Sequence, residues 1–242
     1  MHRNVRIVLV ETSHPGNIGG VARAMKNMGL DTLYLVNPAV FPHAKATARA
    51  SGADGILKST VVCSSLAEAL QGCTRVYGAS ARERTIAWPQ VSPRACAQAI
   101  EADAEDSITA IVFGRERSGL RNDELDQCQA MLHIPCNPDF SSLNLAAAVQ
   151  VVCYELHVAR NEEPVNRREW DSGERASTQD EINAFYEHLD RTLVQTQFLD
   201  PDNPRQLRRR LRRLFNRVEP SNVEVNILRG ILTSVEKTIS RD

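Results

Sequence analysis

The chain has 242 residues with 29 Lys plus Arg against 30 Asp plus Glu, a formal net charge of -1, and 42% hydrophobic residues. This balance excludes a histone-like polycation and an acidic solvating tail, and the apolar content excludes disorder throughout the chain and a fibrous repeat. No stretch approaches the roughly 20 apolar residues of a membrane span, and no signal-peptide apolar region follows the first residues. We expect a cytoplasmic protein with no membrane partner.

The six cysteines lie at positions without a C-x-x-C pair. This spacing fits neither a disulfide framework nor a structural zinc site. We expect reduced thiols and no bound metal.

Short apolar runs alternate with helix-like segments over residues 1–160. The expected strands cover 5–10, 32–36, 60–63, 75–78, 108–114 and 130–134. The expected helices cover 17–29, 43–50, 65–71, 93–102, 122–128 and 142–160. This alternation is typical of an α/β domain with a mostly parallel sheet, and we expect one over 1–160.

Polar residues with few apolar ones fill 161–178, which indicates a linker. Three helical patterns follow it, at 179–197, 203–217 and 221–239, separated by Pro-containing breaks. The pattern predicts a small all-helical domain over 179–242.

Arginine is concentrated in one of these helices. The chain has 25 Arg and 4 Lys, and seven of the arginines lie in residues 205–217, which contain no acid. Leucines at helical spacing predict an inward apolar stripe, with guanidinium groups on the remaining faces. Such a helix suits a phosphate backbone; a solvated charged face and a genome that favours Arg codons are the alternatives. We predict that the nucleic-acid backbone is contacted by Arg208, Arg209, Arg212 and Arg213.

Residues 11–25 form the first of three polar segments that follow expected strands. Gly16, Gly19 and Gly20 permit close backbone approach, and the helix that begins there offers free N–H groups. Arg23 shares a helix face with Gly19 and Gly20. The glycine spacing fits neither a P-loop nor G-x-G-x-x-G, so this segment alone identifies no ligand.

The second and third segments are residues 111–120 and 134–149. The second is a strand that ends at Gly114 and continues into a charged loop with Arg115 and Glu116, which must be solvated, paired or used for binding. In the third, Ser141 or Ser142 is expected to cap an Ala-rich helix, with Asn144 close to its start.

In this order, the motifs N-x-G-x-x-x-R, F-G-R-E-R-x-G-L and I-P-x-N-P-x-F-S-S-L-N-L-A-x-A-V resemble the SPOUT superfamily of S-adenosylmethionine (AdoMet)-dependent RNA methyltransferases, in its bacterial TrmJ branch. The resemblance covers the first domain and the Arg-rich tail. It implies a deep trefoil knot in the C-terminal part of the α/β domain and a homodimer. It also implies 2'-O-methylation of cytidine or uridine at position 32 of the tRNA anticodon loop.

The resemblance also implies roles for individual residues. AdoMet is expected to be held by Ala79, Ser80, Ala81, Gly114, Ile134, Ser141, Ser142 and Leu143. By the same resemblance, Asn17 and Arg23 are catalytic candidates and the substrate side includes Arg115, Glu116 and Asn144. We add Ser142 as a catalytic candidate and the loop residues Arg82 and Arg84 as contacts with tRNA.

The proton acceptor stays open at this point. The family proposal gives this role to Arg23, but a guanidinium is effectively always protonated. In the alternative, Arg23 binds a phosphate and Ser142 or a phosphate oxygen receives the proton. Two other functions also fit: a ribosomal RNA 2'-O-methyltransferase, which shares the motifs, and a non-catalytic RNA-binding module.

Overall fold

The computed structural model describes residues 4–81, 88–103, 106–161, 171 and 173–240. The chain divides into two compact units, residues 1–70 with 75–168 and residues 71–74 with 169–242. The predicted contacts Arg82 and Arg84 lie outside the described residues, as does most of the predicted linker. The domain boundaries drawn from the sequence therefore stay predictions.

A parallel sheet is the centre of the first unit. Its described strands are β1 (Val5–Val10), β2 (Leu33–Val36), β3 (Val61–Cys63), β4 (Arg75–Ala79), β5 (Gln90–Val91), β6 (Thr109–Phe113) and β7 (Ala130–Leu132). They lie in the order β3-β2-β1-β6-β4-β7-β5, and each neighbouring pair is parallel. This confirms the predicted α/β class; the strand order does not itself test the knot, which stays a prediction.

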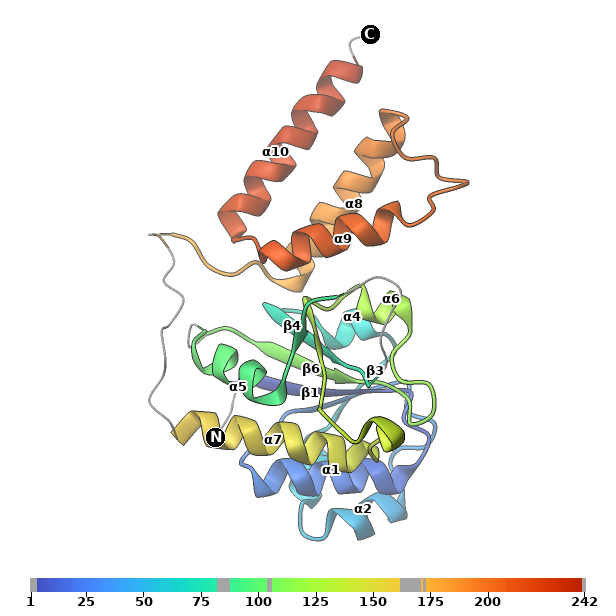
Figure 1. Cartoon of the computed structure of the whole chain (residues 1–242), viewed down its shortest axis with the longest axis vertical. Helices are drawn as coiled ribbons and strands as arrows, with labels where there is room; N and C mark the ends of the chain where they lie inside the picture. The colour runs from blue at the N-terminus through green and yellow to red at the C-terminus, as the bar shows by residue number, and fades with distance from the viewer. Residues whose placement is uncertain (1–3, 82–87, 104–105, 162–170, 172, 241–242) are drawn as a thin grey trace. The chain divides into compact units, whose positions relative to one another are not determined.

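Helices cover both faces of the sheet. They are α1 (Pro15–Asn27), α2 (Ala44–Ala50), α3 (Asp54–Ser59), α4 (Leu66–Ala69), α5 (Pro93–Glu101), α6 (Asn122–Leu125) and α7 (Leu145–Asn161). Figure 1 shows α1, α2 and α7 on one side of the sheet and α4 and α6 on the other. Because α1 packs against both α2 and α7, the first and third sequence motifs meet on one side.

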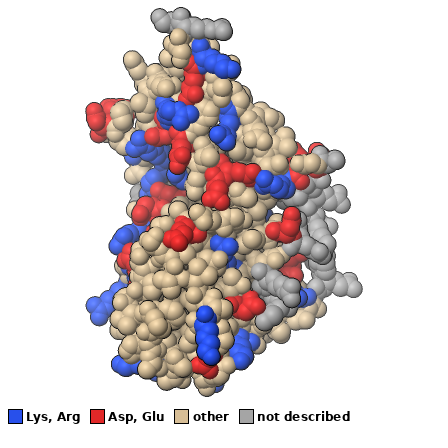
Figure 2. All heavy atoms as spheres, turned by 180° about the vertical axis from the view of Figure 1, so that it is seen from behind, with Lys and Arg blue, Asp and Glu red and all other residues tan. Residues whose placement is uncertain are grey.

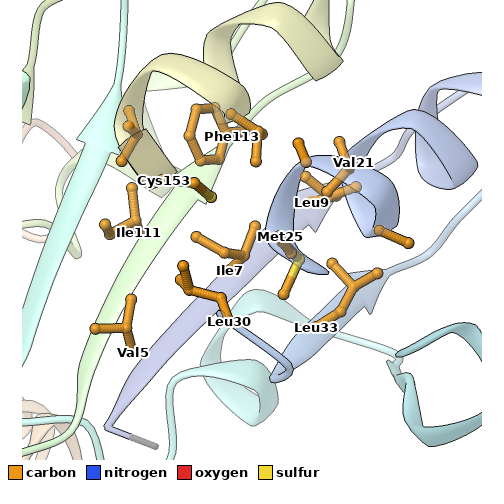
Figure 3. Close-up of a cluster of buried hydrophobic side chains, with 14 of the residues drawn as sticks. Val5, Ile7, Leu9, Val21, Met25, Leu30, Leu33, Ile111, Phe113 and Cys153 are labelled. Atoms are coloured by element: carbon orange, nitrogen blue, oxygen red, sulfur yellow. The ribbon is translucent and has the colours of Figure 1, made fainter. Parts of the chain in front are cut away.

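The core lies between β1, β6 and the helices α1 and α7. Figure 3 shows Ile7 and Leu9 of β1 beside Met25 of α1, with Phe113 of β6 and Cys153 of α7 next to them. All five side chains are at most 2% exposed. The nearly continuous burial along β1 and β6 is what a central strand covered on both faces requires.

Two glycines permit close approaches that other residues would block. A Cβ at Gly19 would lie 2.0 Å from the Ala46 carbonyl oxygen, so α1 and α2 pack here only without a side chain. A Cβ at Gly114 would lie 2.2 Å from the carbonyl carbon of Gly119. The loop after β6 therefore folds back directly over the end of its own strand.

The start of α7 differs from the prediction. Asn137 caps a short 3-10 turn, η1 (Pro138–Phe140), and α7 begins only at Leu145. The cap is Asn144, whose Oδ1 accepts a hydrogen bond from the Ala146 N–H at 3.0 Å. The expectation that Ser141 or Ser142 caps this helix is wrong, because both serines precede the cap in a non-helical loop.

The second unit contains α8 (Gln179–Gln195), α9 (Leu207–Val218) and α10 (Asn222–Ile239). Capping boxes begin α8 at Thr178 and α10 at Ser221. Its core is small: Phe185 of α8 meets Phe215 of α9 edge to face, with ring centroids 4.8 Å apart, and Val225 and Leu232 of α10 are buried with it. The three predicted helices are confirmed, although α9 begins at Leu207 because Pro204 precedes a left-handed Arg205 (φ 46°).

Within the part of the chain that the structure describes, no helix is long and apolar enough to cross a membrane.

Candidate active site

A cavity of about 370 Å³ lies where β4, β6 and β7 end. Carboxyl ends of neighbouring strands are where open α/β sheets bind their ligands, and this volume suits a small molecule. Its lining includes every residue predicted to hold AdoMet: Ala79, Ser80, Ala81, Gly114, Ile134, Ser141, Ser142 and Leu143. Three separate loops thus converge on one site.

Other lining residues were not predicted from the sequence. Phe113 and Leu132 form apolar walls at the strand ends, and Leu145 and Ala148 extend that wall from α7. The remaining unpredicted members belong to the loops that the motifs occupy: Arg117, Ser118, Gly119 and Cys136. Arg117 and Gly119 are fixed positions of the second motif, whereas Ser118 and Cys136 fall on variable positions of the second and third motifs.

Arg115 lines the cavity, but its guanidinium lies between two carboxylates. Its Nη2 is 2.7 Å from Glu11 Oε1 and 2.8 Å from Glu124 Oε1, and its Nη1 donates to the Gly119 carbonyl at 3.3 Å. The Arg115 side chain is 13% exposed and that of Glu124 is 9% exposed. Hydrogen bonds to Glu11 and then Glu124 raise the pKa of Arg115, and the bond from Arg115 lowers the pKa of Glu11. The structure therefore shows Arg115 tying the 115–119 loop to the end of β1 and to α6.

Glu116 also lines the cavity, and its carboxylate lies at the N-terminus of α1. It accepts hydrogen bonds from the Ser13 N–H at 3.1 Å, the His14 N–H at 3.2 Å and Asn17 Nδ2 at 3.0 Å. Burial would raise the pKa of Glu116, but these donors outweigh it and lower the pKa to about 2. A fixed carboxylate at the positive end of a helix is favourable, so Glu116 joins the second motif to the first.

Asn17 extends this connection to the third motif. Its Oδ1 accepts a hydrogen bond from Asn144 Nδ2 at 3.1 Å, while its Nδ2 donates to Glu116. Because Asn144 also caps α7, one chain of side chains links Glu116, α1 and α7. Neither Asn17 nor Asn144 lines the cavity.

Arg23 lies elsewhere on α1. Its side chain is exposed, it does not line the cavity, and it has no ion pair with any described residue. It lies six positions after Asn17, or about 9 Å along the helix axis. Within one chain, the structure thus does not bring Arg23 and Ser142 into the same cavity wall.

The predicted RNA contacts of α9 belong to the second unit. Arg208 pairs with Asp190 at 2.7 Å, and the Arg212 guanidinium lies 4.4 Å from the Tyr186 ring centroid. Arg209 and Arg213 are half-buried on the same helix. On the face that Figure 2 shows, basic and acidic side chains of this unit lie interspersed rather than in one large basic patch.

All six cysteines are free, and every one except Cys136 is buried. No cluster of three or more His, Cys, Asp or Glu suited to a metal ion occurs among the described residues.

Comparisons with known proteins identify the family. Residues 4–154 match the SpoU rRNA methylase family, and residues 180–242 match the C-terminal domain of the tRNA methyltransferase TrmJ. A tRNA (cytidine/uridine/adenosine-2'-O-)-methyltransferase TrmJ from Pseudomonas aeruginosa is 52% identical, over 96% of this chain and 94% of its own. A tRNA (cytidine/uridine-2'-O-)-methyltransferase TrmJ from Pectobacterium atrosepticum is 49% identical, over 97% and 98%.

Among solved structures, TrmJ from Z. mobilis ZM4 has a TM-score of 0.83 at 35% identity, covering 96% of this chain and 98% of its own. Both units of this chain therefore have counterparts in the same relatives, and the chain belongs to the SpoU methylase family, in its TrmJ branch.

Proposed function

We propose that the protein is an AdoMet-dependent methyltransferase that modifies the ribose 2'-OH of cytidine or uridine at position 32 in the tRNA anticodon loop. The observation that carries this proposal is the cavity at the ends of β4, β6 and β7, in which all the predicted cofactor residues converge. The names of relatives about half identical to this chain support the same reaction class and substrate. Position 32 itself rests on the TrmJ resemblance.

The residues of the cavity fit AdoMet. Leu132, Ile134 and Leu143 give apolar walls for a flat ring, and the Ser141 and Ser142 loop offers hydroxyl and backbone groups. Gly114 lets the 115–119 loop close over the strand end. When bound, AdoMet supplies a methyl group on a sulfonium, which requires only an aligned nucleophile.

The protein's task is then to orient a ribose hydroxyl and to help remove its proton. An unpaired anticodon loop exposes its 2'-OH groups without strand opening, and only RNA has them. Arg23 is suited to hold the adjacent phosphate and to stabilise the developing alkoxide, and Ser142 or a phosphate oxygen is suited to receive the proton. Replacing Arg23 with Lys keeps the charge but removes the fork of donors, so R23K should lose most turnover. Turnover near that of the wild type would argue against a specific guanidinium role.

We also propose that the active form is a homodimer in which Arg23 of one copy serves the cavity of the other. Arg23 does not line the cavity of its own chain. Apolar side chains are exposed close to the cavity loop and along α7: Phe140 is 80% exposed, Leu143 40% and Tyr154 52%. A second copy packed here would cover them.

Mixing two inactive variants tests this arrangement. R23A keeps an intact cavity, and G114V keeps Arg23 but displaces the 115–119 loop that forms part of the cavity wall. If Arg23 acts across the interface, mixed dimers have one complete site and should recover about a quarter of wild-type activity after subunit exchange. A mixture that stays inactive, although the subunits have exchanged, would show that Arg23 acts within its own chain.

Methyl transfer from labelled AdoMet to an unmodified tRNA tests the proposed function. The matched control is the same tRNA with a 2'-deoxynucleotide at position 32, which should accept no methyl group. Equal labelling of both tRNAs would refute methylation at position 32. Labelling of a ribosomal RNA fragment alone would favour the alternative function, 2'-O-methylation of ribosomal RNA. We place the reaction in the cytoplasm, in keeping with the free cysteines.

A further inference from the structure

Five of the six arginines of α9 fall into two sets by what surrounds them. The first set, Arg208 and Arg212, is engaged with α8. Arg208 donates to both carboxylate oxygens of Asp190, at 2.7 and 3.0 Å. Arg212 lies over the Tyr186 ring, and the Tyr186 hydroxyl lies 3.1 Å from the Arg212 carbonyl oxygen and donates to Asn216 Oδ1 at 2.6 Å. The Nη1 of Arg212 is buried without a hydrogen-bond partner in the described structure, as is the Nε of Arg213. What sets Arg212 apart is therefore its contact with the Tyr186 ring.

The second set is Arg210, Arg213 and Arg217. Spacings of three and four residues place them on one face of α9. Arg210 and Arg217 are exposed and Arg213 is half-buried. None of the three has an ion pair with a residue that the structure describes.

This set is destabilising for the isolated helix. Like charges at these spacings repel, and α9 has no acidic residue that could relieve them. In the first set, by contrast, Asp190 and the Tyr186 ring provide the compensation. A polyanion lying along the face would relieve the repulsion and would release counterions on binding.

We propose that the phosphate-binding stripe of the helical unit is formed by Arg210, Arg213 and Arg217. Arg208 and Arg212 instead hold α9 in place. This proposal rests on tRNA being the substrate. The ligand is the sugar-phosphate backbone of RNA, contacted without base readout. This changes the sequence-based prediction, which named Arg208 and Arg212 as contacts and left out Arg210 and Arg217.

The test compares two double variants of the full-length protein that remove the same charge from the same helix, R210Q/R217Q and R208Q/R212Q. Binding of unmodified tRNA is measured by anisotropy at several salt concentrations. Each lost phosphate contact should reduce the slope of log K against log salt by about 0.7 to 0.9. R210Q/R217Q should therefore flatten the slope by about 1.4 to 1.8, with AdoMet affinity unchanged.

R208Q/R212Q should flatten the slope by less than half as much and should instead lower the melting temperature. R210K/R217K should retain the wild-type slope, because the charges remain. The proposal is overturned if R210Q/R217Q leaves the slope unchanged, or if R208Q/R212Q flattens it equally while remaining folded. Methyl transfer by the wild type is the separate readout of the proposed function: if it persists while the slope fails to move, the stripe is wrong and the function stands.

Discussion

At the scale of single residues, two charged side chains of the cavity lining are paired with other groups of the protein. Arg115 and Glu116 are adjacent in sequence, but one is enclosed by carboxylates and the other by N–H donors. The carboxylates around Arg115 belong to Glu11 and Glu124. Nothing in the sequence distinguishes these two residues from acidic residues at the surface. Their role depends on the strand order, which brings the end of β1 beside that of β6.

Removing the Arg115 side chain should destabilise the first unit. R115A leaves the nearly buried Glu124 without its charged partner, which should cost about 3 to 5 kcal/mol of unfolding free energy. Arg121 is the matched control, because its side chain is 60% exposed and its Nη2 lies 3.3 Å from Glu11 Oε2, a longer ion pair than those of Arg115. R121A should cost under about 1 kcal/mol. Urea denaturation of both variants checks this, and equal costs would contradict the enclosed role of Arg115.

Glu116 should contribute a pH-dependent part of the stability. Its folded pKa of about 2 lies below the ordinary value of 4.5. The stabilisation is therefore complete above pH 4.5 and is lost as the pH falls toward 2. E116Q should be less stable at pH 7, by about 1 to 3 kcal/mol.

Between pH 4.5 and pH 2, E116Q should lose less stability than the wild type, which denaturation midpoints at several pH values measure. E116Q should also weaken AdoMet binding. E68Q removes a carboxylate that accepts hydrogen bonds from Ser64 and does not line the cavity, so it should leave AdoMet affinity unchanged. Parallel pH profiles for E116Q and the wild type would refute the depressed pKa.

At the scale of elements, glycine decides how the loop after β6 closes. G114A adds a Cβ that would lie 2.3 Å from the Leu120 nitrogen and 2.2 Å from Gly119. The 115–119 loop must then move away from the strand end, and the cavity wall moves with it. We expect AdoMet affinity to fall at least tenfold, a loss of about 1.4 kcal/mol.

Gly55 gives the control, because a Cβ there meets no atom within 4 Å. G55A should bind AdoMet as the wild type does. Calorimetric titration of both variants makes the comparison. Wild-type affinity for a folded G114A would show that the loop does not depend on this contact.

The sequence predicted most elements because their apolar patterns were strong. β1 and β6 contain the apolar runs Ile7–Val10 and Ala110–Phe113, and α8 and α10 have capping boxes. The elements it missed, α3 and β5, are six and two residues long and carry too little periodicity to detect. The cap of α7 was misassigned because serine and asparagine are both good caps, and only the η1 turn determines which one reaches the helix.

The site could be predicted only in part, for a related reason. Motif residues at strand ends were placed in one cavity by the resemblance and by the rule for parallel sheets. The enclosure of Arg115, the carboxylate of Glu116 at α1 and the distance of Arg23 from the cavity all depend on side-chain directions. Spacing in the sequence does not contain that information.

At the scale of the whole molecule, chemistry and RNA contact are assigned to different units. The cavity belongs entirely to the first unit, and the arginine helix α9 belongs to the second. The net charge of -1 is therefore compatible with the basic stripe proposed on α9, and it does not exclude a nucleic-acid partner.

Removing residues 161–242 should separate these two properties. The truncated protein should bind AdoMet as the full chain does, because no lining residue is lost. Its affinity for tRNA should fall, and the remaining affinity should depend less steeply on salt because the phosphate contacts of α9 are gone. Unchanged tRNA affinity would contradict the role given to the helical unit.

Mass spectrometry of nucleosides and of nuclease fragments, after incubation of the protein with AdoMet and unmodified tRNA, tests directly whether the ribose at position 32 is methylated. We expect 2'-O-methylcytidine or 2'-O-methyluridine in the anticodon-loop fragment that contains position 32, and its absence with R23A. A methyl group on a base, a methylated ribose confined to another position, or no methylation by a protein that binds both AdoMet and tRNA would contradict it.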